Sequence, residues 1–285
     1  MVEDLIDAAT IDSVRRELDE IEAGVDALLK GLPDERMFIA EAGAITFSPH
    51  AVKQSPAARA VSRHPAIAEL CHDLIGPDVR LYWDQIVYKK PEKPRDFPWH
   101  QDNGYTYVVP QQYLTIWLAL SDAPVDAGCP WVAPGVHLGG TLAHEYVDPL
   151  GHRCFESHPD AVPAPVPAGG AVVFSSLTPH MTGPNLTDEV RKTYILQYGE
   201  APGRDPKVLG YKLYNQKWDE VNQRFEAPVA NGFVPYRLQE PCSWGSVFVA
   251  EPYAKYLHWY VRNKHIDPFA PNAWSNTWNP QRSAK

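Results

Sequence analysis

The segment between residues 80 and 200 most limits what this chain can fold into. It contains short runs rich in Tyr, Trp, Ile, Val and Thr, namely RLYWDQIVYKK, YLTIWLAL, AVVFSS and KTYILQYG. Clusters of turn-forming residues such as KPEKPRD and DAPVDAGCP separate these runs. Short strands at this spacing are typical of an antiparallel barrel or a double-sheet roll. We therefore expect a mainly β core of the jelly-roll, or cupin-like, kind with flanking helices.

The first 79 residues show a different pattern, which predicts helices. Apolar residues recur every three or four positions between residues 10 and 30, as they do on one face of an amphipathic helix. Ser55-Pro56 and Pro65 are typical starts of two further helices. We expect residues 1–285 to form a single domain, in which a mostly helical part (1–79) precedes the core at 80–200. The sequence assigns no role to the C-terminal extension at 201–285.

The composition argues against several classes of partner. The formal net charge is −9 at pH 7, and no long cluster of Lys and Arg interrupts this acidic balance. Nucleic-acid backbones and anionic membranes attract the opposite charge. Four widely spaced cysteines and an acidic, amphipathic start favour reduced thiols and no signal peptide. We expect a cytoplasmic protein that acts on a small molecule and binds neither nucleic acid nor membrane; a homo-oligomer remains open.

His100 and Asp102, in the stretch FPWHQDNGY, are candidate metal ligands. Alternate residues of a strand project to the same face, so a strand here would direct an imidazole and a carboxylate to one point. His158-Pro159-Asp160 and His265-Ile266-Asp267 have the same spacing, so spacing alone does not identify a site. No histidine follows the 265–267 pair, and Pro159 would interrupt a strand ladder. We interpret both of these pairs as loop residues.

His180 is the candidate third ligand, because it ends the strand-like run GGAVVFSSLTPH. Two histidines and one carboxylate on one face of an iron ion leave its other positions open for a cosubstrate and O₂. Arg191 opens the next apparent strand, where it could hold a carboxylate through two parallel hydrogen bonds. Alternatively, Arg191 could cap that strand or pair with Asp188 or Glu189.

Taken together, these motifs resemble the phytanoyl-CoA dioxygenase family of non-haem iron, 2-oxoglutarate-dependent oxygenases. The matching stretches are WHQD, LTIWLAL, AGCPWVAPGVHLGG and PHMTGPNLTDEVRKTYILQY, in the order and at the spacing of the family. They cover roughly residues 80 to 200. The resemblance implies an Fe(II) site formed by His100, Asp102 and His180, with 2-oxoglutarate and O₂ as cosubstrates.

The resemblance also implies a binding site for 2-oxoglutarate. Arg191 would hold its distal carboxylate, and Thr182, Gln101 and Trp117 occupy positions that contact the cosubstrate in the family. The sequence departs from the usual pattern at Pro130 and just before the histidine of PGVH. Neither change affects an expected ligand.

Several aromatic residues near these motifs could line a substrate pocket. Such residues on strands pack in the core more often than they bind ligands. His144, which follows a Gly-Gly turn, is expected to hydrogen-bond loop backbone rather than bind metal. The candidates for substrate contact are Trp83, Tyr105 and Trp131.

The predicted reaction is oxidation of a C–H bond, with release of succinate and CO₂. Hydroxylation is favoured because, in related halogenases, a small residue replaces the carboxylate that Asp102 supplies here. The acidic chain has few basic clusters for the phosphates of CoA, which favours a free apolar molecule, such as a secondary-metabolite intermediate. An acyl-CoA hydroxylase of the same mechanism is the alternative. A non-catalytic ligand-binding barrel and a zinc hydrolase on a similar barrel are the rival classes.

Overall fold

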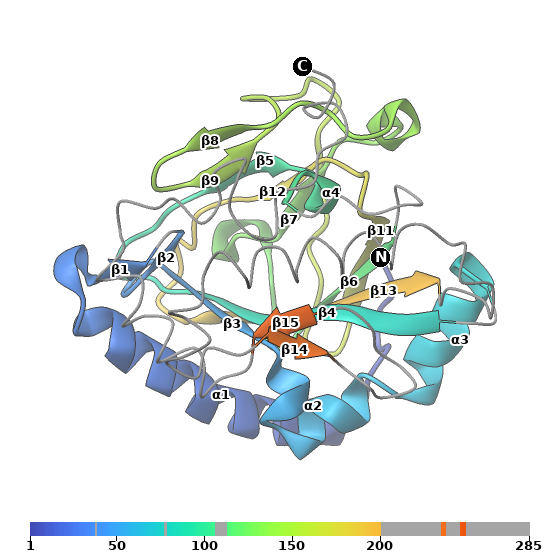
Figure 1. Ribbon diagram of the computed structural model, residues 1–285, viewed down its shortest axis with the longest axis horizontal. Coiled ribbons are helices and arrows are strands. Elements are labelled where there is room, and N and C mark those ends of the chain that lie inside the picture. Colours follow the sequence, from blue (N-terminus) through green and yellow to red (C-terminus); the bar gives the residue numbers. More distant parts are fainter. Residues whose placement is uncertain (38, 77–78, 106–112, 201–234, 238–245, 249–285) are drawn as a thin grey trace.

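Two antiparallel sheets form the core of the molecule (Figure 1). The computed structural model describes residues 1–37, 39–76, 79–105, 113–200, 235–237 and 246–248. The expected mainly β fold with flanking helices is confirmed within these residues. The helix that the stretch EPYAKYLHWYVRNKHI suggests lies outside the described residues, as does most of the C-terminal extension.

The larger sheet has seven strands in the order β1-β2-β3-β4-β13-β6-β11. The four runs that the sequence marked as strands become β4, β6, β11 and β13, and they lie side by side because β13 pairs with both β4 and β6. The seven strands are β1 (Arg36–Met37), β2 (Ala40–Glu41), β3 (Ile45–Pro49), β4 (Val79–Lys89), β6 (Leu114–Ala119), β11 (Ala171–Ser175) and β13 (Arg191–Glu200).

The smaller sheet has four strands in the order β10-β7-β12-β5 and carries two of the candidate ligands. Its strands are β5 (Phe97–His100), β7 (Pro130–Val132), β10 (Val162–Pro163) and β12 (His180–Thr182). Two further strand pairs form separate two-stranded sheets: β8 (Glu145–Val147) with β9 (Gly151–Arg153), and β14 (Pro235–Arg237) with β15 (Ser246–Phe248).

Helices from the N-terminal part lie along the outside of the larger sheet (Figure 1). Asp7 and Ser55 cap the first two, each accepting a hydrogen bond from a backbone N–H in the first turn. In the part of the chain that the structure describes, no helix has both the length and the apolar character needed to span a bilayer. The helices are α1 (Ala8–Lys30), α2 (Pro56–Val61), α3 (Pro65–Leu74) and α4 (Asp102–Tyr105), with 3₁₀ turns at Pro33–Glu35, Ala51–Lys53, Val125–Ala127 and Val136–Gly139.

The side chains of the larger sheet alternate between two hydrophobic clusters. On the outer face, Ile86, Leu118 and Leu196 pack with apolar residues of α1, α2 and α3. On the inner face, Trp117 and Phe174 pack with residues that flank the smaller sheet. Burying one large apolar side chain contributes about 1.5–3 kcal/mol, so both faces of the sheet are held firmly. The inner face provides a rigid wall beside the strands that carry the ligands.

Candidate metal centre

The two candidate histidines face each other across the smaller sheet. His100 ends β5, His180 begins β12, and the two residues are direct partners in the antiparallel pairing. Their ring centroids are 4.2 Å apart, and both residues are buried. The fold therefore brings together residues that are far apart in the sequence.

The local structure around the ligands differs from the sequence prediction in two ways. Asp102 does not share a strand with His100, because β5 ends and Asp102 begins the short helix α4. The backbone leaves the ladder here, since the N–H of Asn103 donates to the carbonyl of Ser176 instead. His180 does not end the preceding run either, because a turn at Ser176 and Leu177 separates it from β11.

The three ligand atoms converge on one point. The Nε2 atoms of His100 and His180 each lie 3.7 Å from Oδ1 of Asp102. Three ligand atoms of these residues lie within 4.8 Å of one another. Atoms this close together could bind one metal ion, because each ligand atom lies about 2 Å from the ion it binds.

The hydrogen bonds of the two imidazoles fit metal binding. Nδ1 of His100 contacts the carbonyl oxygen of Pro98 at 2.8 Å, and Nδ1 of His180 contacts that of Thr178 at 2.9 Å. A carbonyl oxygen only accepts, so each Nδ1 must carry the proton. In a neutral ring this leaves the lone pair on Nε2 free for a metal, the arrangement common among metal-binding histidines.

Burial keeps His100 uncharged. Desolvation first, and the neighbouring His180 second, hold the pKa of His100 well below its ordinary value. The neutral imidazole is the form that binds a metal, because the charged ring has no free lone pair. The donor set of two imidazoles and one carboxylate fits a non-haem iron(II) ion.

Aromatic rings enclose the two histidines. Phe97 lies 4.7 Å from His100 and Phe174 lies 4.4 Å from His180, measured between ring centroids. Tyr105 packs edge-on against His100 at 5.3 Å, and its hydroxyl oxygen accepts a hydrogen bond from the N–H of His152. Of the three candidates for substrate contact, Tyr105 is the one placed directly beside a ligand.

Gln101, between two of the candidate ligands, is occupied by structural contacts. Its Nε2 donates to the carbonyl oxygens of Gly140 and Leu177, and its Oε1 accepts from the N–H of Leu142. The residue is fully buried and both N–H groups of its amide are used, so it has no donor left for a carboxylate of a cosubstrate. This differs from the expected cosubstrate contact and gives Gln101 the role of tying two loops to the ligand segment.

His144 supports the same segment. Its Nε2 accepts a hydrogen bond from the N–H of Gln101 at 3.0 Å, and its Nδ1 contacts the carbonyl of Leu142 at 2.9 Å. The ring also packs so closely on Gly104 that a Cβ atom there would overlap it. The expected structural role of His144 is confirmed, and the contact explains why residue 104 is glycine.

Arg191 begins β13 with its guanidinium buried on the inner side of the barrel. It is 2% exposed, its Nη1 donates to Oγ1 of Thr193 at 2.7 Å, and its Nε has no hydrogen-bond partner. Its Cζ lies 5.0 Å from the centre of the Trp117 ring. Among the residues that the structure describes, no carboxylate pairs with it, so Asp188 and Glu189 do not fill that role. Burial lowers the pKa of Arg191 to about 9.

Lys89 is a further buried cation beside Arg191, and the sequence prediction missed it. The two residues are direct partners between β4 and β13. Nζ of Lys89 donates to the carbonyls of Arg95, Thr182 and Gly183, and desolvation followed by repulsion from Arg191 lowers its pKa. These bonds join β4 to the ligand-bearing strand β12. The sequence does contain a signal for this position. Alternate side chains of β4 face opposite sides of the sheet, which places Lys89 on the inner face with Val87.

The remaining predicted residues have mixed placements. Thr182 is buried two positions after His180 on β12, so the two side chains share a face. Trp83 packs on His50 and donates from Nε1 to Gln85. Trp131 faces Met181, not His180, in the β7–β12 pairing. The cosubstrate role of Thr182 and the substrate roles of both tryptophans therefore stay predictions.

Two packed antiparallel sheets with this His, Asp and His cluster define a jelly-roll protein with a candidate metal centre. A family model described as phytanoyl-CoA dioxygenase (PhyH) matches residues 1–193. That match covers more than half of the sequence, and the chain therefore belongs to the phytanoyl-CoA dioxygenase family.

Curated relatives match parts of the chain. Phytanoyl-CoA dioxygenase domain-containing protein 1 of Bos taurus is 31% identical over 127 residues, which cover 41% of this chain and 44% of that protein. Methylphosphonate hydroxylase of Gimesia maris is 32% identical over 158 residues, 52% of this chain and 56% of that protein. The matches thus span about half the length of these relatives.

Solved structures share the fold. The non-haem α-ketoglutarate-dependent carbocyclase SnoK from nogalamycin biosynthesis has a TM-score of 0.57 at 24% identity, over 70% of this chain and 78% of that chain. The α-ketoglutarate-dependent epimerase SnoN, from the same biosynthesis, has a TM-score of 0.52 at 26% identity, over 70% of this chain and 77% of that chain.

Proposed function

We propose that this protein is an Fe(II)/2-oxoglutarate-dependent oxygenase that hydroxylates a C–H bond of a small organic molecule. The observation that carries the proposal is the convergence of the Nε2 atoms of His100 and His180 on one carboxylate oxygen of Asp102, while the Nδ1 atom of each ring contacts a backbone carbonyl. Iron bound there would supply the redox chemistry that couples O₂ and 2-oxoglutarate decarboxylation to substrate oxidation, with release of succinate and CO₂. Membership of the family supports the same reaction class.

Each nearby residue has a task in this proposal. His100, His180 and Asp102 hold the metal, and Arg191 binds the distal carboxylate of 2-oxoglutarate through its guanidinium, whose Nε has no hydrogen-bond partner. A buried cation without a carboxylate partner is costly unless a ligand supplies one, which supports this assignment. The rings packed around the histidines exclude water from the reacting atoms.

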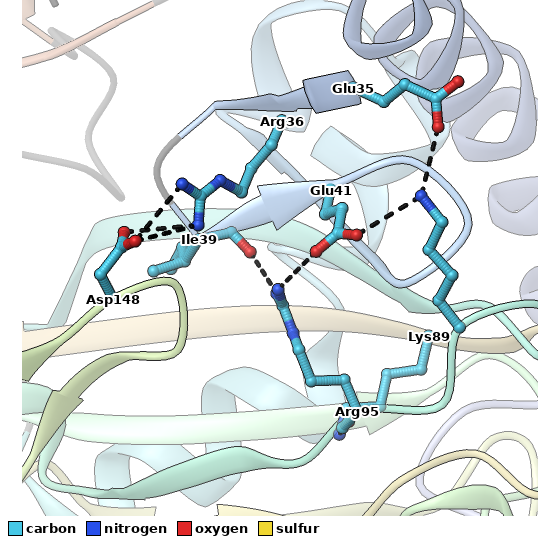
Figure 2. A network of polar contacts seen from close by, with 8 residues as sticks. Glu35, Arg36, Ile39, Glu41, Lys89, Arg95 and Asp148 are labelled. Atoms are coloured by element: carbon cyan, nitrogen blue, oxygen red, sulfur yellow. Dashed lines mark hydrogen bonds and ion pairs between the residues drawn. The ribbon is translucent and has the colours of Figure 1, made fainter. Parts of the chain in front are cut away.

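The charge around the segment that leads into β5 supports a free small molecule rather than a CoA ester. In Figure 2, Arg36 pairs with Asp148, and Arg95 pairs with Glu41. Lys93 pairs with Glu35 and Glu41 as well. Because carboxylates already neutralise Arg36, Lys93 and Arg95, these cations have little positive charge available for the phosphates of CoA.

Relatives and composition support the same substrate class. The Gimesia maris relative is named a methylphosphonate hydroxylase, which is a name for an enzyme acting on a free small molecule. The net charge of −9 disfavours nucleic acid and anionic membranes as partners. The free thiols of Cys71, Cys129 and Cys154 support a reducing, cytoplasmic location.

The proposal is tested by measuring succinate formed from 2-oxoglutarate with Fe(II) and O₂, across a panel of free small acids, aromatic ring systems and acyl-CoA thioesters. We expect a member of the free-molecule set to stimulate succinate release. Stimulation by acyl-CoA thioesters alone would overturn the substrate class but keep the mechanism. No succinate with any compound, together with no Fe(II) binding, would leave a non-catalytic barrel as the better description.

A further inference from the structure

The two oxygens of the Asp102 carboxylate have different surroundings. Oδ1 lies 3.7 Å from Nε2 of His100 and equally far from Nε2 of His180. Oδ2 instead accepts a hydrogen bond of 2.5 Å from the hydroxyl of Thr115, on β6. The threonine hydroxyl is the donor of this hydrogen bond. One oxygen therefore faces the other ligands, and the other is held by the protein.

We propose that Thr115 is a positioning residue for the metal, which holds Oδ2 and so presents Oδ1 as the single ligand atom of Asp102. The inference rests on the proposed iron-dependent function. Two-oxygen coordination would require Oδ2 to turn towards the metal and break its bond to Thr115. The hydroxyl thus keeps a coordination position open for cosubstrate or O₂, and it orients the ligand as partners of metal ligands commonly do.

Asp102 needs this support because of where it lies in the fold. It stands at the start of the four-residue helix α4, and no strand ladder holds its backbone. Thr115 is held far more rigidly, because β6 lies between β11 and β13 in the larger sheet and Thr115 is 1% exposed. The hydrogen bond from Thr115 therefore fixes the carboxylate of Asp102, which lies on a short helix, to the rigid sheet.

The same patch of the inner face supports two other groups of the site. Phe174, the direct partner of Thr115 on β11, packs against the ring of His180. Trp117, two positions after Thr115 on β6, packs against Arg191. One rigid surface thus positions the carboxylate ligand, one histidine ligand and the expected anchor of the cosubstrate.

The test compares substitutions at Thr115 with a matched control. Thr115→Val removes the donor and keeps the shape, whereas Thr115→Ser keeps the donor. Thr46 provides the control, because it is also 1% exposed and its hydroxyl donates to a carboxylate oxygen of Glu22 at 2.8 Å, away from the metal ligands. Thr46→Val therefore loses an equivalent buried hydrogen bond. The readout is binding of Co(II), as a stand-in for Fe(II), to the metal-free full-length protein without O₂.

We expect Thr115→Val to bind Co(II) about 10- to 100-fold more weakly than the wild type, which is the usual effect of losing such a partner. Thr115→Ser should restore binding to within about threefold, since it still supplies the donor. Thr46→Val should bind like the wild type, although both valine variants unfold at a lower temperature.

Wild-type affinity in Thr115→Val would overturn the inference, as would an equal loss in Thr46→Val. Thr115→Ala is measured in parallel, in case the valine variant fails to fold. It also removes the donor, and it places no methyl group against Oδ2. Its expected loss of affinity is the same, and wild-type binding by it would also overturn the inference. Absence of Co(II) and Fe(II) binding by the wild type would instead contradict the proposed function itself, and the inference with it.

Discussion

Arg191 allows the proposed cosubstrate site to be tested through protein stability. Burial lowers its pKa from the ordinary arginine value to about 9. Since the pKa in the folded protein lies below that of the unfolded chain, the free-energy cost of burying the charged guanidinium is fully present at neutral pH. It disappears only as the pH rises above about 9 towards the ordinary pKa of arginine. This difference corresponds to destabilisation on the order of 5 kcal/mol by the buried, charged guanidinium, which no carboxylate of the described residues neutralises.

Arg191→Met removes the charge and keeps an unbranched stem. In the absence of 2-oxoglutarate, we expect the free energy of unfolding to rise by about 1–4 kcal/mol, as when hydrophobic residues replace buried charges. The lost hydrogen bond to Thr193 and the lost contact with Trp117 reduce the gain below the full cost of the charge. At about 2–4 °C per kcal/mol, the midpoint of thermal unfolding should rise by several degrees.

The assay is thermal unfolding of wild type and Arg191→Met at neutral pH, without O₂, with and without 2-oxoglutarate and metal. At about 100 times its dissociation constant, the cosubstrate should stabilise the wild type by about 2.7 kcal/mol. The variant should show almost no such shift, since losing one partner of a buried charge pair costs about 2–5 kcal/mol. Its affinity for Co(II) should remain that of the wild type. An equal shift with 2-oxoglutarate in both proteins would refute the role given to Arg191.

Three further predictions concern neighbouring residues. Gln101→Leu leaves buried backbone groups unpaired and should lower the free energy of unfolding by about 2–4 kcal/mol in urea titrations; a loss below about 1 kcal/mol would contradict its tying role. Burial lowers the pKa values of His50, His100 and His144, so the metal-free protein should lose stability as the pH falls below 6.5, because the unfolded chain takes up protons at these histidines more readily than the folded protein. His100→Asn should remove one such contribution from the slope, and an unchanged slope would argue against it. Trp117→Leu should weaken 2-oxoglutarate binding about 3- to 30-fold in calorimetry, because it removes a cation–π contact with the guanidinium; unchanged binding would count against that contact.

Much of the fold could be predicted because hydrophobic periodicity and turn residues act locally. The runs that became β4, β6, β11 and β13 were recognisable from their aromatic and β-branched residues. Ser55 and the prolines at 56 and 65 marked the starts of α2 and α3 correctly. The order of strands in the sheets was not accessible, because it depends on pairing between distant segments.

The candidate site shows where sequence reasoning reached its limit. His100, Asp102 and His180 were found as a set, yet the geometry assumed for Asp102 was wrong, because a backbone hydrogen bond to Ser176 ends the strand. The structural contacts of Gln101 and the inward position of Lys89 also depend on loops and strands that meet in three dimensions. The spacing of residues in the sequence indicates which of them can form a site together. The role of each residue depends on the hydrogen bonds that it makes in the folded protein.

The most direct test of the central claim is the simultaneous measurement of O₂ consumption and succinate formation by the purified protein with 2-oxoglutarate. The account predicts that succinate appears only with both Fe(II) and O₂, and that Asp102→Ala and Arg191→Met each abolish it at low cosubstrate concentration. Turnover that persists without O₂, or with Zn(II) in place of Fe(II), would contradict the account. So would succinate formation at the wild-type rate in the Asp102→Ala variant.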